Sequence, residues 1–245
     1  MDFQLKKHIP NAITCCNLMS GCAATGAAFY GHYHWAVVMI VVGAVFDFFD
    51  GLTARALGVS SPIGKELDSL ADVVTFGVAP SAMVFQLFGI VQTPAWLQPL
   101  APYLPYTAFL MAAFSALRLA KFNLDDRQQT SFIGLPTPAN ALFWASLIAA
   151  QLPWLASPRF NAVWLFLFML AACFLLVSEL PLFALKFKNL TWADNRVRFI
   201  FLAGAVLLLL AGLLTSLGLT AVPLVILWYL GLAIFDGTLT RSSLD

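Results

Sequence analysis

The chain has 245 residues, of which 61% are hydrophobic and only 10% are charged. Soluble domains average about 45–50% apolar and about 25% charged residues, so this composition excludes a soluble enzyme. A net charge of +1 excludes a basic nucleic-acid binder, and four Cys are too few for a secreted disulfide scaffold. The class that remains is a polytopic membrane protein with short connections between its helices.

Apolar segments long enough to cross a bilayer follow one another along the chain, which predicts an all-α bundle of about eight transmembrane helices. Only Gly218 and its neighbours interrupt the last apolar stretch, so six spans followed by a re-entrant hairpin are the alternative. The expected spans are 11–30, 35–55, 66–90, 103–122, 138–156, 160–183, 198–217 and 219–238.

The Lys and Arg residues set the expected orientation, because such residues accumulate in cytoplasmic loops. If the N-terminus is cytoplasmic, all of the 13 cations except Arg159 lie at cytoplasmic ends of the spans. This distribution predicts that both termini are inside and that the number of spans is even. The segment 184–198 mixes cations and Trp192 with apolar residues and is expected to lie at the headgroup level.

Four Asp residues are candidates for function, because carboxylates inside spans are costly. Asp47 and Asp50 share one helical face of the second span, and Asp68 and Asp72 share one face of the third. At 1.5 Å per residue, Asp47 and Asp72 are each expected roughly 12 Å from the cytoplasmic end of their helix. The two helices are antiparallel, so the four carboxylates should converge just inside the cytoplasmic interface.

Such a cluster predicts a divalent-metal site, because four uncompensated carboxylates in one pocket repel one another. Oxygen ligands suit Mg or Mn, and two ions about 3.5–4 Å apart are a common device for displacement at phosphorus. Gly51, Ala54 and Gly64 lie on the same faces as the acids and leave room for a bulky ligand. Close helix packing is the alternative explanation for these small residues.

The stretch from Asp47 to Asp72 reads DFFDGLTARALGVSSPIGKELDSLAD, which follows the pattern D-x2-D-G-x2-A-R-x8-G-x3-D-x3-D. This pattern resembles the signature of the CDP-alcohol phosphatidyltransferases, with every fixed position present. The resemblance implies a helical membrane enzyme that moves a substituted phosphate from a CDP-linked donor to an alcohol and releases CMP.

Further segments are similar to the membrane-embedded branch of this family that uses serine as the acceptor. They read IPNAITCCNLMSG, KELDSLADVVTFGVAPS, SALRLAKFN, FIGLPTPA and VSELPLFALK. The resemblance implies CDP-diacylglycerol and L-serine as substrates, two Mg or Mn ions, and a homodimer in the inner membrane with its site facing the cytoplasm. It also divides the single transmembrane domain 1–245 into a family-like core at 1–186 and C-terminal helices at 187–245.

The same resemblance implies roles for the clustered acids and their neighbours. Asp47, Asp50 and Asp68 would bind metal, and Asp72 would bind metal or act as general base on the serine hydroxyl. Helix capping is the alternative role for Asn11 and Thr14, and a topology anchor at the membrane surface is the alternative role for Arg55. The expected CDP pocket is lined by Asn11, Thr14, Gly51, Ala54, Arg55 and Gly64.

The acceptor carries a carboxylate, which should be received by a cation. Arg118, Lys121 and Lys186 are the candidates, although each also fits a topology anchor. Ser178, next to Glu179 near the end of the sixth span, is the candidate for contact with the serine ammonium or hydroxyl.

Other functions fit part of the sequence. The same chemistry with glycerol 3-phosphate or inositol phosphate is the first alternative, although phosphate-bearing acceptors would favour more basic residues in the pocket. An ion-coupled transporter is the second, but transporters usually place the site near the midplane and show repeated halves. An inactive scaffold is disfavoured because every signature position is intact.

Overall fold

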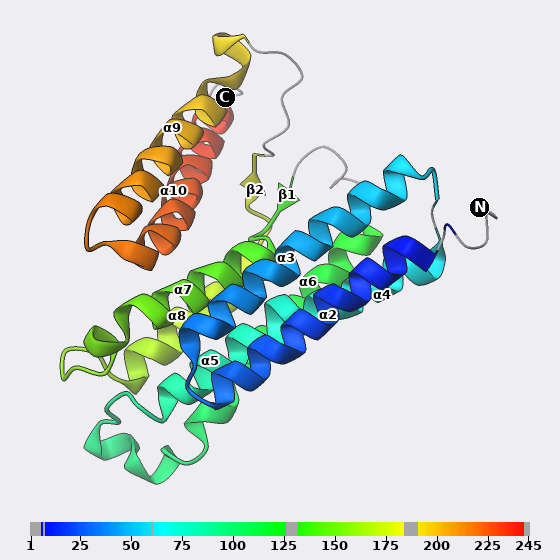
Figure 1. Cartoon of the computed structure of the whole chain (residues 1–245). Coiled ribbons are helices and arrows are strands. Elements are labelled where there is room, and N and C mark those ends of the chain that lie inside the picture. The colour runs from blue at the N-terminus through cyan, green and yellow to red at the C-terminus, as the bar shows by residue number, and fades with distance from the viewer. Residues whose placement is uncertain (1–5, 7, 60, 126–131, 184–190, 243–245) are drawn as a thin grey trace.

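The computed structural model describes residues 6, 8–59, 61–125, 132–183 and 191–242, and it is a helical bundle (Figure 1). The first half of the chain forms α2 (His8–Phe29), α3 (Tyr33–Ala56), α4 (Pro62–Asp72), the π-helix η1 (Val73–Val78), α5 (Ala79–Phe88) and the 3-10 helices η2 (Ala95–Leu100) and η3 (Leu104–Phe109). The second half forms α6 (Leu110–Leu124), β1 (Phe132–Ile133), α7 (Thr137–Leu155), α8 (Ala162–Val177), β2 (Pro181–Leu182), α9 (Trp192–Leu214), the 3-10 turn η5 (Gly218–Thr220) and α10 (Ala221–Ser242).

A helix overlaps each of the expected spans, and the predicted fold class, a polytopic helical membrane protein, is confirmed. In the described part of the chain, five helices are long and apolar enough to cross a membrane, namely His8–Phe29, Tyr33–Ala56, Pro62–Phe88, Asp194–Leu214 and Gly218–Asp236. The third of these joins α4, η1 and α5 into one continuous helix. The last two are separate long helices, which is the arrangement expected for two full spans rather than a short hairpin.

Several predicted helix boundaries differ from the structure, and three of them have a local reason. The third span begins at Pro62, earlier than expected, because Ser61 caps the helix by accepting a hydrogen bond from the Gly64 amide at 3.0 Å. The fourth is α-helical only from Leu110, because the segment before it forms 3-10 turns. The sixth ends at Val177, where Ser178 adopts an extended conformation and Pro181 follows.

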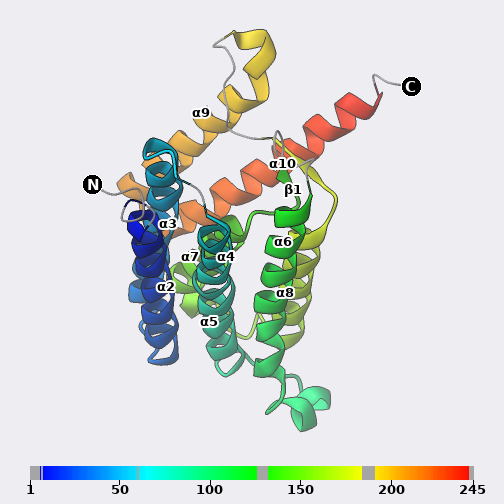
Figure 2. The same ribbon diagram turned by 90° about the vertical axis from the view of Figure 1, so that its right-hand side faces the viewer.

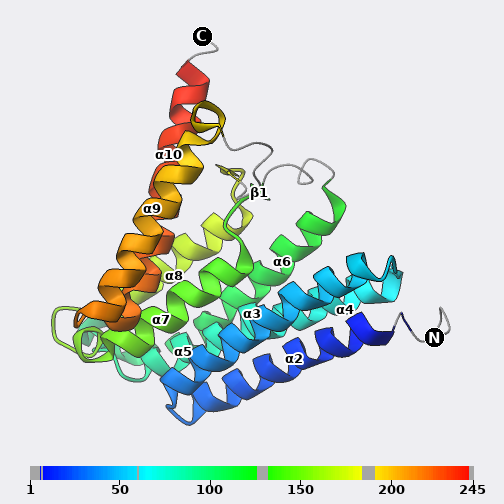
Figure 3. The ribbon, with the colours of Figure 1, turned by 45° about the horizontal axis from the view of Figure 1, so that its top comes forward.

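The bundle is organised around the third helix of the fold, α4–η1–α5. Helix α2 packs against α3, α4 and α5, while α7 packs against α3 and α5 on another side. Helices α6 and α8 pack together, and the β1–β2 pair ties the segment before α7 to the end of α8 through antiparallel pairing of Phe132 with Leu182 (Figure 2). The pair α9–α10 lies against α7 through α10 (Figure 3).

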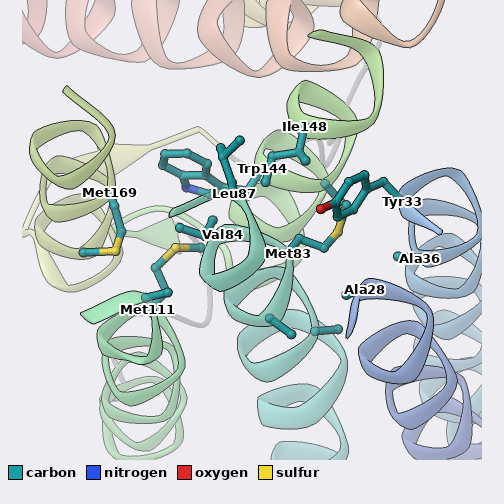
Figure 4. Close-up of a cluster of buried hydrophobic side chains, with 14 of the residues drawn as sticks. Ala28, Tyr33, Ala36, Met83, Val84, Leu87, Met111, Trp144, Ile148 and Met169 are labelled. Carbon is teal, nitrogen blue, oxygen red and sulfur yellow. The ribbon is translucent and has the colours of Figure 1, made fainter. Parts of the chain in front are cut away.

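The apolar core lies between the helices of this bundle (Figure 4). Side chains from α2, α3, α5, α6, α7 and α8 meet there, and many of them are fully buried. Large apolar residues also cover the outer surface, as expected where lipid replaces water. The labelled core residues are Ala28, Tyr33, Ala36, Met83, Val84, Leu87, Met111, Trp144, Ile148 and Met169.

Thr75, in the π-helix, marks the closest approach of α2, α3 and η1. A Cβ atom added to Gly21 of α2 would lie 2.7 Å from the Thr75 Cα, and one added to Gly43 of α3 would lie 2.5 Å from the Thr75 Cγ2. Both positions therefore require the absence of a side chain. Small residues at such contacts let membrane helices approach closely.

We expect Gly21→Ala to destabilise the protein by about 1–3 kcal/mol, because the new methyl group would collide with the backbone of Thr75 as well as with its side chain. For a chain of this size the melting temperature in detergent should fall by roughly 2–10 °C. Gly26→Ala on the same helix is the matched control, because its Cβ would meet no atom within 4 Å. Equal melting temperatures for the two variants would contradict the packing described here.

Candidate active site

Three of the four predicted acids lie together between α3 and α4. Asp47 and Asp50 come from α3 and Asp68 from α4, and one carboxylate oxygen of each lies within 4.8 Å of the others. Both helices pack against α2. The turn that reverses the chain uses Gly58 at φ +63°, a conformation that side chains disfavour.

Asp72 lies one helical turn beyond Asp68, outside this group of three, and is 7% exposed. Its Oδ1 accepts a hydrogen bond of 3.1 Å from the Asn17 Nδ2 of α2. Asp50, 6% exposed, accepts a 2.6 Å hydrogen bond at Oδ2 from the Thr14 hydroxyl, also on α2. Helix α2 thus supplies hydrogen-bond donors to acids on both facing helices.

The donor set fits a hard divalent cation. Three carboxylates supply oxygen ligands at close range, and these are the ligands that Mg and Mn prefer. The Asp68 Oδ1 is buried and has no hydrogen-bond partner among the described residues. A buried carboxylate oxygen without a partner is costly, and a bound cation would compensate for it.

A cavity of about 210 Å³ adjoins the acids, between α2, α3 and α4. All but one of the residues predicted to contact the nucleotide line it. Lys65 also lines it, while the Lys65 Nζ donates a 3.0 Å hydrogen bond to the Asn123 carbonyl of α6. The full lining is Pro10, Asn11, Thr14, Asp50, Gly51, Ala54, Val59, Ser61, Gly64, Lys65 and Asp68.

The exception, Arg55, lies beside this cavity. Its side chain is exposed, and its Nη1 lies 3.3 Å from the place that a Cβ on Gly51 would take. The guanidinium therefore folds back along the glycine, at the edge of the cavity. A Cβ on Gly64 would lie 3.1 Å from both the Asn11 Oδ1 and the Ser61 Oγ, so this glycine also leaves room at the cavity wall.

The candidate acceptor residues are not all brought to one place. Arg118 is 7% exposed, lies close enough to Asp72 for their charges to interact, and has its guanidinium carbon 5.1 Å from the centre of the Phe122 ring. Lys121 is exposed on α6. Ser178 donates a 2.9 Å hydrogen bond to the Leu175 carbonyl at the end of α8, and Lys186 lies outside the described residues.

Residues 7–187 match the sequence profile of CDP-alcohol phosphatidyltransferase. The chain belongs to this family. The resemblance predicted from the signature is therefore confirmed, and the acids between α3 and α4 are the acids of the family signature.

Curated relatives carry the name CDP-diacylglycerol–serine O-phosphatidyltransferase. The Bacillus subtilis protein is 40% identical over 136 residues, which are 54% of this chain and 70% of the relative. The Mycobacterium leprae protein is 31% identical over 185 residues, which are 71% of this chain and 57% of the relative. The Methanocaldococcus jannaschii protein is 38% identical over 104 residues, which are 42% of this chain and 45% of the relative. The matched part thus spans about half the length of two of these relatives.

Two polar residues beside the family signature were missed in the sequence. Asn17 and Thr75 are fully buried, and the Thr75 hydroxyl donates a 3.0 Å hydrogen bond to the Asn17 carbonyl. Asn17 could have been found in the sequence, because Asn11, Thr14 and Asn17 are polar residues spaced by three in an apolar span. Thr75 carried no such signal, because its place depends on the π-helix.

The π-helix η1 begins directly after the last acid of the family signature. A π-helical turn adds a residue to an α-helix and often occurs at a functional site. Here Val73–Val78 shifts the side-chain register between α4 and α5 within one continuous helix. The acids of α4 and the apolar core residues of α5 can therefore both face the interior of the bundle.

Proposed function

We propose that this protein transfers the phosphatidyl group from CDP-diacylglycerol to L-serine, giving phosphatidylserine and CMP. The observation that carries the proposal is the group of three carboxylates, from Asp47, Asp50 and Asp68, beside a cavity between α2, α3 and α4. The names of the relatives support serine as the acceptor. We also propose an inner-membrane site facing the cytoplasm, which the positions of the cations support.

The donor would place its nucleotide in the cavity and keep its acyl chains in the bilayer. Gly51, Ala54 and Gly64 leave room for the nucleotide at the cavity wall, and Asn11 offers an amide to it. Arg55, at the edge, is suited to a bidentate contact with phosphate. A site roughly 12 Å below the interface suits a lipid whose pyrophosphate lies at the headgroup level.

Asp47, Asp50 and Asp68 would hold one or two Mg or Mn ions, with Asp72 as a further ligand or as the base. When bound, such ions neutralise phosphate oxygens and stabilise the charge that develops in a displacement at phosphorus. Thr14 orients one of the ligand carboxylates through its 2.6 Å hydrogen bond to Asp50. The buried surroundings strengthen these electrostatic interactions.

Asp72 is the proposed general base. It would take the proton of the serine hydroxyl while that oxygen forms a bond to the lipid-side phosphorus. The bond between this phosphorus and the bridging oxygen breaks, and its electron pair leaves with CMP. One displacement of this kind needs no covalent enzyme intermediate.

Arg118 is the proposed partner of the acceptor carboxylate. It is buried on α6 near Asp72, and its Nε has no hydrogen-bond partner among the described residues. Asp72 is its near opposite charge, and the buried Nε, which is costly to leave without a partner, can take a second anion. The carboxylate of serine would supply that anion next to the proposed base.

An acceptor panel tests the proposal. Detergent-solubilised protein with CDP-diacylglycerol and Mg or Mn should release CMP with L-serine, and at least about 100-fold more slowly with ethanolamine, which lacks the carboxylate. Glycerol 3-phosphate and inositol phosphate complete the panel. Release of CMP with glycerol 3-phosphate but not with L-serine would refute the serine assignment.

The same panel tests Arg118. Arg118→Gln should raise KM for L-serine by about tenfold or more, since it removes a charge-assisted contact, and leave KM for CDP-diacylglycerol within about twofold. Arg159→Gln, an exposed arginine between α7 and α8, is the control. An unchanged KM for serine in Arg118→Gln would remove Arg118 from the acceptor site.

A further inference from the structure

A buried amide on α2 contacts the proposed base. Asn17 is fully buried in the middle of an apolar helix, and its Nδ2 donates a 3.1 Å hydrogen bond to the Asp72 Oδ1. Neither α3 nor α4 supplies this contact, although these two helices carry all the acids of the family signature. Asn17 therefore acts on the acidic site from a separate helix.

The orientation of the amide follows from its neighbours. An amide NH2 attracts a carboxylate and an amide oxygen repels it, so Nδ2 must face Asp72. The Asn17 Oδ1 then points toward α3, where a Cβ on Gly43 would lie 3.0 Å away. Among the described residues, Oδ1 has no hydrogen-bond partner, so one contact, to Asp72, accounts for the polar character of this buried side chain.

Asn17 is itself held in place from the helix that carries Asp72. Thr75, three residues beyond Asp72, donates its hydroxyl to the Asn17 carbonyl at 3.0 Å. Gly21 and Gly43 leave the space that Thr75 occupies between α2 and α3. The backbone of Asn17 and the carboxylate of Asp72 are thus fixed relative to each other by two hydrogen bonds across one helix contact.

We propose that Asn17 is a positioning residue that orients the carboxylate of Asp72 for proton transfer from the acceptor hydroxyl. The inference rests on the proposed function, because it presumes that Asp72 is the base. The amide occupies Oδ1, and the hydrogen bonds of the described residues leave Oδ2 for the acceptor. A hydrogen bond to one oxygen restricts the rotation of the carboxylate, and correct orientation contributes strongly to rate.

A purely structural role makes a different prediction. If Asn17 served packing alone, an apolar residue of similar size would be tolerated or even favoured at this depth. If it positions Asp72, the same substitution should lower the rate of the chemical step while the fold and donor binding persist. The two roles are therefore separated by comparing kcat, KM for CDP-diacylglycerol and melting temperature.

The experiment uses the full chain in detergent with CDP-diacylglycerol, Mg and L-serine. Asn17→Leu should lower kcat by about 10–100-fold, leave KM for CDP-diacylglycerol within about twofold, and leave the melting temperature within a few degrees of the unsubstituted protein. Asn17→Asp keeps the shape of the side chain and replaces the donor by a second carboxylate, and it should lose at least as much activity. Thr25→Val is the control, since the Thr25 hydroxyl on the same helix bonds only to the Gly21 carbonyl among the hydrogen bonds described here.

A kcat within about twofold of the unsubstituted protein in either variant would overturn the proposal. So would a loss of activity that merely follows a lower melting temperature in both variants. If Asn17→Leu does not fold, Asn17→Asp decides, because it changes no volume. If the unsubstituted protein uses an alcohol other than serine, the proposed acceptor is wrong. The kcat values of the two Asn17 variants are then compared with that of the unsubstituted protein using that alcohol. If none of the alcohols supports CMP release by the unsubstituted protein, both proposals fail.

Discussion

Asp72→Asn should lower kcat for serine-dependent CMP release by about 10²–10⁴-fold, the usual contribution of a positioned general base. The substitution keeps the shape of the side chain but replaces the carboxylate by an amide, which is too weak a base to accept the serine proton. KM for CDP-diacylglycerol should change little, because Asp72 does not line the cavity next to α3 and α4. A fall in kcat with a constant KM marks an interaction made in the transition state.

Asp236→Asn is the control for Asp72→Asn. Asp236 lies on α10, beyond the segment that matches the family, so its substitution should leave kcat within about twofold. Full transferase activity in Asp72→Asn would refute the assignment of Asp72 as base. Recovery of activity at high Mg or Mn would instead identify Asp72 as a ligand whose loss weakens metal binding.

The position of the acids could be predicted from the sequence because helix geometry alone determines it. Asp47 and Asp50 are one turn apart, as are Asp68 and Asp72, and a short turn makes their helices antiparallel. The two helices are then held side by side by α2, against which both of them pack. The cavity residues of α3 and α4 follow from the same geometry.

The contacts of α2 and α6 could not be predicted in this way. Asn17 meets Asp72, and Arg118 approaches it, only because separate helices pack at particular rotations around α4. Helix rotation depends on small residues such as Gly21 and Gly43, whose purpose appears only once Thr75 is seen between them. The π-helix had no sequence signal, although it sets the direction of Thr75.

Helix ends were the other source of error. An apolar stretch continues past Val177, so hydropathy alone extends the sixth span to residue 183. Ser178 ends the helix in the structure, because its extended backbone leads into β2 and its hydroxyl bonds the Leu175 carbonyl. Ser178 was predicted to face the acceptor, and in the structure its hydroxyl is engaged at this helix end.

Removal of divalent cations with a chelator should abolish CMP release, lowering it by about 10³-fold or more, and Mg or Mn should restore it. Without the cation the charge on the phosphate oxygens of the donor is not neutralised, and the carboxylates of Asp47, Asp50 and Asp68, with one oxygen of each within 4.8 Å of the others, repel one another. The same repulsion gives a readout independent of activity. Saturating metal should raise the melting temperature by roughly 5 °C, because only the folded protein holds the three carboxylates together.

Asp47→Asn and Asp68→Asn should each reduce this thermal shift and raise the metal concentration needed for activity by about tenfold or more, since each removes one charged ligand. Asp236→Asn, on α10, should keep the full shift. In the absence of metal, Asp47→Asn and Asp68→Asn should also be slightly more stable than the unsubstituted protein, because each removes one repulsive charge. Two results together would contradict the metal site: CMP release that persists after exhaustive chelation, and a melting temperature that does not change when Mg or Mn is added. The three carboxylates would then not be metal ligands.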